Sequence, residues 1–327
     1  MPSPAETLAD TIGAIRALHR RRTFLMAQRK AKDLALGAFI RLDLGWHRGL
    51  PADERKAIAT RAAEMIEAGR KALHGKGNGS EDAAYPGLHS IILASHKSCA
   101  DIETLEAETT RAMEKLAKTL PVWGAWAKEV KGLGARSLAV IVGEAGDLGS
   151  YDKGEAGVWK RLGLAVIDGK RQGSAGKGAD AATWLRHGYS PARRAAMFVI
   201  GDCLIKQQGR YREIYLARKT IEAAKAEAAG LRVLPAAKIK KSEAAGCISE
   251  MHIHRRAQRY MEKRLLRHLL RAWRRAEQSA PERAMGHAPA AERHTPSAPA
   301  EGEGQPSRAR KRASGEAPYP VFHEAAE

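Results

Sequence analysis

Hydrophobic residues recur with helical spacing over the first part of the chain. Residues 5–44 predict an amphipathic helix, with the basic run Arg20-Arg21-Arg22 on its polar side. Pro51 suits the first turn of a second helix, 52–74, and the glycine-rich run 75–80 ends that helix. The apolar side of the first helix is expected to contain Leu8, Ile12, Ile15, Leu18 and Leu25.

A third helix is predicted over residues 86–119, with a seven-residue rhythm. Half of its repeating positions are small or polar, which makes a weak zipper on its own. We therefore expect residues 1–120 to form an antiparallel helical hairpin or a partner-dependent coiled coil. The repeating positions are Leu88, Ile91, Ser95, Ser98, Ile102, Leu105, Thr109, Ala112 and Leu116.

The pattern changes at Pro121 to short helices separated by glycines, and the glycine-rich stretch 163–178 cannot be regular helix. A linker near 229–247 precedes a last amphipathic helix, 249–275, so that residues 121–275 form a second, compact helical domain. Residues 276–327 are rich in Pro, Ala, Gly, Ser and charge, which predicts a disordered tail. The last helix is expected to bury Met251, Ile253, Tyr260, Met261, Leu265, Leu266, Leu269, Leu270 and Trp273.

Composition and charge support an all-α fold and a polyanionic partner. Aromatic residues make up only 5% of the chain, which disfavours a sandwich or barrel. The net charge is +19, and residues 275–327 hold 7 basic and 8 acidic residues, so the excess positive charge belongs to the part expected to fold. Nucleic acid is the commonest partner of such a chain.

Three cysteines, Cys99, Cys203 and Cys247, are widely spaced and form no CxxC pair, so we expect reduced thiols and no zinc site. No apolar run approaches the 18 residues of a membrane span, and no secretory signal is readable. The chain is expected to be cytoplasmic.

Residues 130–139 carry the sharpest local motif, an apolar-Gly-apolar-Gly turn followed by a helix of small residues. This is the pattern of a helix-hairpin-helix, in which Gly132 and Gly134 expose backbone N–H groups to a phosphate. Lys131 and Arg136 would flank that phosphate with positive charge. The alternative is an ordinary helical corner in which the glycines only permit close packing.

Further sequence motifs follow the hairpin motif along the chain. These motifs are Gly146-Asp147-Leu148-Gly149-Ser150-Tyr151, Leu162-Gly163-Leu164, a Gly/Ser loop, the segment from His187 to Met197, and Arg210-Tyr211-Arg212-Glu213-Ile214-Tyr215. Together with the hairpin motif, they resemble the C-terminal domain of the insertion-sequence 110/116/902 type transposases. These mobile-element recombinases are described as guided by a bridging RNA. The resemblance covers roughly residues 115–275.

The resemblance implies that a serine in the loop after Leu-Gly-Leu attacks the DNA backbone, and Ser174 is the matching residue. Lys170, Arg171 and Lys177 would supply positive charge around it, and Arg193 and Arg194 would contact phosphates. Where the family commonly has a proline after Leu-Gly-Leu, this chain has Ala165. A serine that only contacts phosphate or solvent is the alternative for Ser174.

The family's N-terminal RNase H-like domain, with its four metal-binding carboxylates, has no counterpart in the sequence. The acidic residues near the N-terminus fall on helical faces or loops. Without such a cluster no two-metal phosphoryl displacement is expected from this chain alone, and no cofactor is identified. A divalent metal would have to come from a partner chain, so the sequence leaves enzymatic activity open.

His252 and His254 lie two residues apart on the last predicted helix and so point to different sides, which disfavours a metal pair. With Arg255 and Arg256 they are interpreted as basic surface.

The sequence is consistent with three functions. The first is a transposase-family DNA-binding protein for transposition or recombination, with strand chemistry at Ser174. The second is a catalytically inactive nucleic-acid-binding module derived from a transposase. The third is a helical scaffold for an acidic protein. DNA is the expected partner, with guide RNA and a second copy joined through the helical region as further partners, and no membrane is expected.

Overall fold

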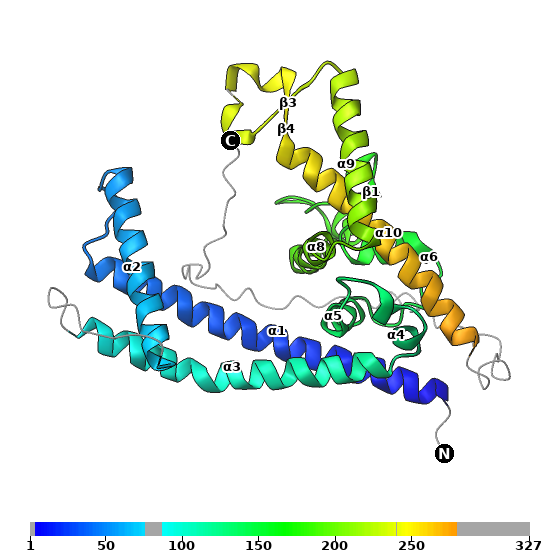
Figure 1. Cartoon of the computed structure of the whole chain (residues 1–327), viewed down its shortest axis with the longest axis horizontal. Coiled ribbons are helices and arrows are strands. Elements are labelled where there is room, and N and C mark those ends of the chain that lie inside the picture. The colour runs from blue at the N-terminus through cyan, green and yellow to red at the C-terminus, as the bar shows by residue number, and fades with distance from the viewer. Residues whose placement is uncertain (1–3, 76–86, 240, 280–327) are drawn as a thin grey trace, which may run out of the picture.

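The computed structural model describes residues 4–75, 87–239 and 241–279, and within them the fold is all-α, as the sequence predicts (Figure 1). The α-helices are α1 (Pro4–Asp43), α2 (Ala52–Leu73), α3 (Leu88–Thr119), α4 (Pro121–Ala125), α5 (Ala135–Ala145), α6 (Gly154–Arg161), α7 (Ala181–His187), α8 (Pro191–Lys206), α9 (Arg210–Ala228) and α10 (Glu250–Gln278). Short 3₁₀ helices are η1 (Ala127–Glu129), η2 (Ala236–Lys238) and η3 (Lys241–Gly246).

Two small sheets complete the described part of the chain. Strands β1 (Val166–Ile167) and β2 (Lys170–Arg171) pair antiparallel inside the glycine-rich loop. Strands β3 (Arg232–Leu234) and β4 (Cys247–Ser249) pair in parallel, with Arg232 opposite Cys247. The segment expected to be a linker, 229–247, therefore contains secondary structure that pairs with itself and leads directly into α10.

Helices α1 and α3 lie antiparallel and form, with α2, a long arm (Figure 1). The direction follows from the polar contacts, because residues later in α1 meet residues earlier in α3. Arg22 Nε donates to Thr110 Oγ1 at 2.9 Å, and Lys32 Nζ donates to the Ser98 carbonyl oxygen at 2.8 Å. Of the two arrangements that the sequence allowed, the structure has the antiparallel hairpin.

The buried stripe of α3 differs from the predicted seam. Two predicted seam residues, Ile91 and Leu105, are 43% and 50% exposed. The buried side follows the 3.6-residue turn of a straight helix rather than a strict heptad, so it moves by about one position from the predicted seam. Its buried residues are Leu88, Ile92, Cys99, Thr110, Met113 and Ala117.

One hydrophobic core joins the base of the arm to the rest of the molecule. It contains residues of α1, α3, α5, α8 and α10, among them Ile15, Met113, Ile141, Leu204 and Leu265. A second cluster holds the far end of the arm, and a third packs β3 and β4 against α9 and α10. Helix α10 crosses the body beside α9, with α8 and α6 against it (Figure 1).

Helix α10 continues to Gln278, so residues 276–278 belong to a helix and not to the predicted tail. The remainder of that predicted tail, residues 280–327, lies outside the described residues. The three cysteines are free thiols, with Cys99 buried, as expected from their spacing.

The glycine hairpin (residues 130–134) forms the predicted corner before α5, and its two glycines differ. Gly132 has φ +91°, and a Cβ added there would lie 2.9 Å from the Leu204 Cα of α8. Gly134 has φ −69°, and a Cβ added there would meet nothing within 4 Å. Gly132 is therefore required by packing, whereas Gly134 is free of that constraint.

Replacing Gly132 by alanine should lower the free energy of unfolding by at least about 2 kcal/mol, because a left-handed backbone and a contact with α8 backbone both penalise a Cβ. The matched change Gly134→Ala should cost less than about 1 kcal/mol, because its backbone is extended and its surroundings are open. Urea denaturation of the two variants measures both values, and equal losses would contradict this account of the corner.

Candidate nucleic-acid interface

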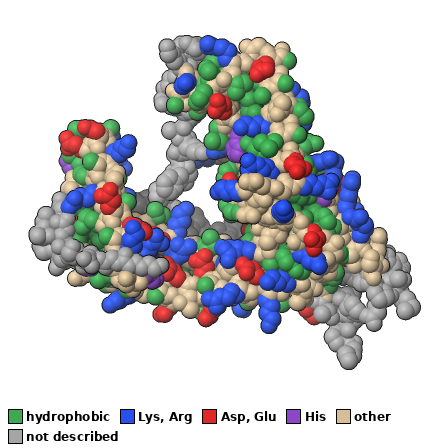
Figure 2. Space-filling model, in the orientation of Figure 1, with side chains coloured by type: hydrophobic (Ala, Val, Ile, Leu, Met, Phe, Trp, Pro, Cys, Tyr) green, Lys and Arg blue, Asp and Glu red, His purple; other side chains and the backbone are tan. Residues whose placement is uncertain are grey.

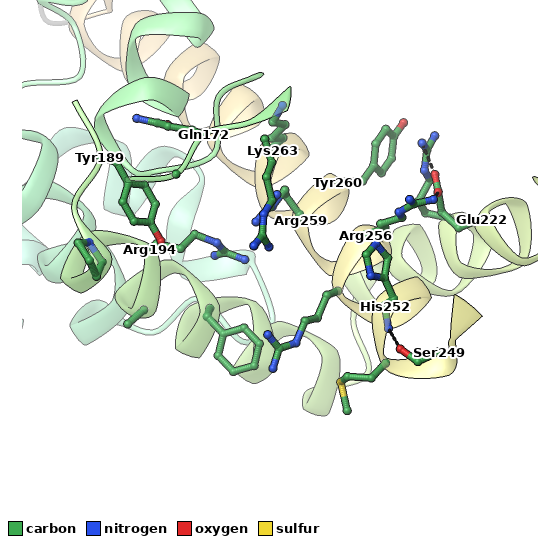
Figure 3. A pocket seen from close by; sticks show the side chains of 18 of the residues that line it. Gln172, Tyr189, Arg194, Glu222, Ser249, His252, Arg256, Arg259, Tyr260 and Lys263 are labelled. Carbon is green, nitrogen blue, oxygen red and sulfur yellow. Dashed lines mark hydrogen bonds and ion pairs between the residues drawn. The ribbon is translucent and has the colours of Figure 1, made fainter. Parts of the chain in front are cut away.

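A cleft of about 1300 Å³ opens where the loop after β2 meets α8, α9 and the first half of α10 (Figure 3). We call it the cationic cleft. Arg194 of α8 points toward Arg259 and Lys263 of α10, and Arg256 lies farther along the same wall (Figure 3). Its basic lining consists of Arg171, Arg194, Arg218, Arg255, Arg256, Arg259 and Lys263. Figure 2 shows many Lys and Arg side chains on the body of the molecule around this region.

Helix α10 provides more of the lining than any other element, because one face of its first half is basic and the opposite face is apolar. Residues spaced by three or four positions share a helix face, and His252, Arg255, Arg259 and Lys263 follow that spacing. The opposite face of this half of the helix is buried and apolar, with Ile253, Ala257, Met261 and Leu265, and farther along α10 also buries Leu266, Leu269, Leu270 and Trp273. Burial of that face fixes the direction in which the cations project.

The loop on the other side of the cleft is held by one buried glutamine. Gln172 is 2% exposed, and its side-chain oxygen accepts a hydrogen bond from the Ala165 N–H at 3.1 Å. Its side-chain nitrogen donates to the carbonyl oxygens of Lys160 (2.9 Å) and His187 (2.5 Å). Both polar atoms of this amide are thereby used, and Ser174, two residues later, lines the cleft.

The N-termini of two helices also face the cleft. Helix α8 begins at Pro191 with Ser190 as its cap, and α10 begins after Ser249, whose hydroxyl accepts from the His252 N–H at 3.1 Å. Pro191 and Ser249 both line the cleft. Helix N-termini carry partial positive charge, so they add to the attraction that the side chains exert on an anion.

The cations of the cleft are only partly neutralised. No carboxylate within the described parts of the chain lies at ion-pair distance from Arg171, Arg255, Arg259 or Lys263. Burial lowers the pKa of Arg259, and the neighbouring charges of Arg194 and Arg171 lower it further. This crowding of like charges raises the energy of the empty cleft, and a bound polyanion would relieve it.

His252 experiences the same field. Burial lowers its pKa, and Arg256, Arg171, Arg255 and Arg259 add to the shift. Both effects favour the neutral imidazole. An approaching phosphate would oppose these cations and favour its protonation.

Two carboxylates balance part of the charge. Glu222 of α9 lines the cleft and pairs with Arg218 at 2.5 Å and with Arg256 at 3.6 Å. Glu262 of α10 lies completely buried behind the wall and pairs with Arg194 at 2.9 Å. Burial raises the pKa of Glu262 to about 7, although the charges of Arg194 and Arg259 act in the opposite direction.

The structure brings together three of the residues selected from the sequence, since Arg171, Ser174 and Arg194 all line the cleft. Lys170 and Lys177 are exposed on the same loop but are not part of the lining. The Ser174 hydroxyl is exposed and accepts a hydrogen bond from the Gly176 N–H at 3.4 Å.

Arg193 points away from this group. Its Nε lies 3.2 Å from Glu144 Oε2 of α5, and the other oxygen of Glu144 lies 2.9 Å from His19 Nε2 of α1. Burial and these partners leave Arg193 24% exposed, so its first role is to join α8 to α5 and to the arm. A phosphate contact by Arg193 would have to compete with Glu144.

The glycine hairpin lies apart from the cleft, because none of Lys131, Gly132, Gly134 and Arg136 is among the lining residues. Lys131, Gly134 and Arg136 are exposed, whereas Gly132 packs on α8. Arg136 Nε donates to Glu114 Oε1 of α3 at 2.8 Å. Of the two cations that the hairpin was predicted to offer to phosphate, Arg136 is therefore already paired with a carboxylate.

The cations of α9 and α10 form most of the basic lining, and the sequence did not identify them as a site. Sequence reasoning interprets Arg255 and Arg256 only as basic surface, and it assigns Met251 and Tyr260 to the apolar face. In the structure Met251 is 52% exposed and lines the cleft with Tyr260. The spacing of the cations by three or four residues can be seen in the sequence of the helix. The sequence does not show which loop lies opposite them.

Comparisons with protein-family models, curated proteins and solved structures gave no match for this chain. Across the described ranges, no group of three His, Cys, Asp or Glu side chains is placed to hold a metal ion. None of the described helices combines the length and apolar character needed to cross a membrane.

The raised pKa of Glu262 predicts a pH-dependent stability. Between its ordinary value of 4.5 and about 7 the folded state binds more protons at Glu262 than the unfolded state, so stability falls as pH rises through this window. The loss should total about 3 kcal/mol and be absent in Glu262→Gln.

Urea denaturation at several pH values from 4.5 to 8 would measure this as the difference between wild type and variant. Contributions of groups that are present in both proteins cancel in that difference. A difference that stays constant with pH would show that Glu262 does not titrate in this way.

Proposed function

We propose that this chain is a DNA-binding protein of the transposase type, which holds the sugar-phosphate backbone in the cationic cleft and acts in the cytoplasm. The observation that carries the proposal is the convergence of Arg255, Arg259 and Lys263, all without carboxylate partners among the described residues, opposite Arg171 and Arg194. Phosphate-directed contacts of this kind bind many sequences and position the polymer without reading bases.

The alternative of a helical scaffold for an acidic protein is less well supported. Arginines and helix N-termini bind carboxylate as well as phosphate oxygens, so the preference for DNA rests on the high density of cations and on the size of the cleft. The cleft also exceeds the usual 300–1,000 Å³ of small-molecule sites, which favours a segment of a polymer.

Neutralising Arg255, Arg259 and Lys263 to glutamine should weaken DNA binding and reduce its salt dependence. Each lost phosphate contact removes about 0.9 from the slope of log K against log salt, so the triple variant should lose about 2–3 units. Fluorescence anisotropy at several salt concentrations measures both quantities.

A matched control removes the same charge from the arm, at the exposed Lys56, Lys71 and Lys97. This control should keep a slope near that of the wild type. The double change Lys131→Gln and Arg136→Gln tests the glycine hairpin and should remove at most about 2 units. If the arm control loses as much as the cleft variant, the attraction comes from overall charge and not from the cleft.

A second function, strand chemistry at Ser174, is favoured by the position of its exposed hydroxyl beside Arg171 in the cleft. In this proposal the Ser174 oxygen bonds to phosphorus while a bridging P–O bond breaks, and the serine proton passes through solvent to the leaving oxygen. The products are a phosphodiester that joins Ser174 to one DNA end and a free hydroxyl on the other end. The nearby cations would stabilise the developing charge, and a partner chain would supply the divalent metal.

The chemistry is tested with supercoiled DNA and Mg²⁺ or Mn²⁺. The added metal replaces the one that a partner chain would supply, so wild-type protein should produce chelator-sensitive nicks that Ser174→Ala abolishes, whereas the exposed-loop control Ser150→Ala retains them. Equal products from wild type and Ser174→Ala would remove the catalytic proposal and leave the binding module.

A further inference from the structure

Aromatic and apolar side chains are exposed among the cations of the cleft. Phe198 of α8 is 39% exposed and Met251 of α10 is 52% exposed, and both line the cavity. Tyr189 and Tyr260 lie toward opposite ends of it, with Arg259 and Lys263 between them (Figure 3). These side chains are accessible to a ligand that has apolar flat surfaces as well as negative charge.

Arginine side chains lie beside part of this aromatic surface. The Arg218 guanidinium lies over the Tyr260 ring at 4.5 Å from its centroid, and Arg264 lies at 6.0 Å. Tyr189 packs beside Gly163 and Arg194, because a Cβ at Gly163 would lie 3.4 Å from the Tyr189 ring and 3.1 Å from Arg194 Cβ. The Tyr260 ring therefore has guanidinium groups beside it, and the Tyr189 ring packs close to the backbone of Gly163 near the start of the Arg194 side chain.

Duplex DNA cannot use such a surface fully. Its bases are stacked on one another, and it presents phosphates and groove edges to a protein. An unpaired strand offers the faces of its bases, which stack on aromatic side chains while its phosphates follow a basic groove. The mixture of Phe198, Met251 and tyrosines with unpaired arginines corresponds to this second kind of ligand.

We propose that the cationic cleft binds an unpaired segment of DNA, with bases packed on Phe198 and Met251 and phosphates on Arg255, Arg259 and Lys263. This inference rests on the proposed DNA-binding function and specifies the form of DNA that the cleft takes. Arg194 and Arg171, from the opposite wall, complete the contacts to the backbone. Base stacking tolerates any sequence, so the preference is for strandedness and not for a site.

The test uses the full chain and labelled oligonucleotides of one mixed sequence, as single-stranded DNA, duplex DNA and single-stranded RNA. Wild type should bind the DNA strand more tightly than the duplex at equal salt. Phe198→Ala should weaken binding to the strand by about tenfold, leave duplex affinity within about twofold, and keep the salt slope unchanged. Phe198→Trp should restore strand binding.

Val199→Ala is the matched control, because Val199 is 60% exposed on the same helix but does not line the cleft. It should bind all three oligonucleotides as wild type does. Thermal melting confirms that each variant is folded. In Phe198→Trp, the fluorescence of the added indole, obtained by difference from wild type, should be quenched by the strand and much less by the duplex.

Three results would overturn the inference. Equal losses on strand and duplex in Phe198→Ala, or tighter binding of wild type to duplex, would contradict it while DNA binding stands. At least tenfold tighter binding of the RNA strand than of the DNA strand would replace DNA by RNA as the ligand. Failure to bind any of the three oligonucleotides in low salt would remove the proposed function together with the inference.

Discussion

The packing of α10 is the constraint on which the rest of the structure depends. The apolar face of its first half, with Ile253, Ala257, Met261 and Leu265, is almost completely buried, and its second half also buries Leu269, Leu270 and Trp273. The rotation of this helix is thereby fixed, and the arginines on its other face must line a common wall. Cations crowded in this way repel one another, and the hydrophobic burial of the same helix offsets the cost. The stability of the fold and the orientation of the basic side chains therefore both follow from the amphipathic character of α10.

Helices were predictable because their signals are local. The apolar spacing and Pro51 placed α1 and α2 to within about one residue, and Gly146 marked the end of α5. The stripe of α3 was displaced because its partner, α1, selects the buried side and no local pattern contains that information. The strands β3 and β4 were missed for a related reason, since three residues paired across an insertion carry little periodicity.

The candidate site was predictable only in part. Ser174 and Arg171 belong to a loop with a recognisable composition, and Arg194 follows a helix-start proline. Their neighbours Arg255 and Arg259 come from the last helix, and only the tertiary fold brings these segments together. The buried Gln172 gave no signal of its own, because its importance lies in three hydrogen bonds to distant backbone groups. Conversely, the glycine hairpin was visible in the sequence, but the packing of Gly132 on α8 accounts for one of its two glycines.

Consecutive arginines at the start of α8 belong to different networks. Arg193 joins Glu144 and His19 beneath the arm, whereas Arg194 reaches Glu262 behind the cleft wall. The first turn of α8 thus connects the arm, through Glu144 and His19, to the wall of the cationic cleft. The same turn of α8 is therefore an anchor for the arm on one side and a support for the cleft wall on the other, and a substitution that displaces its backbone would disturb both.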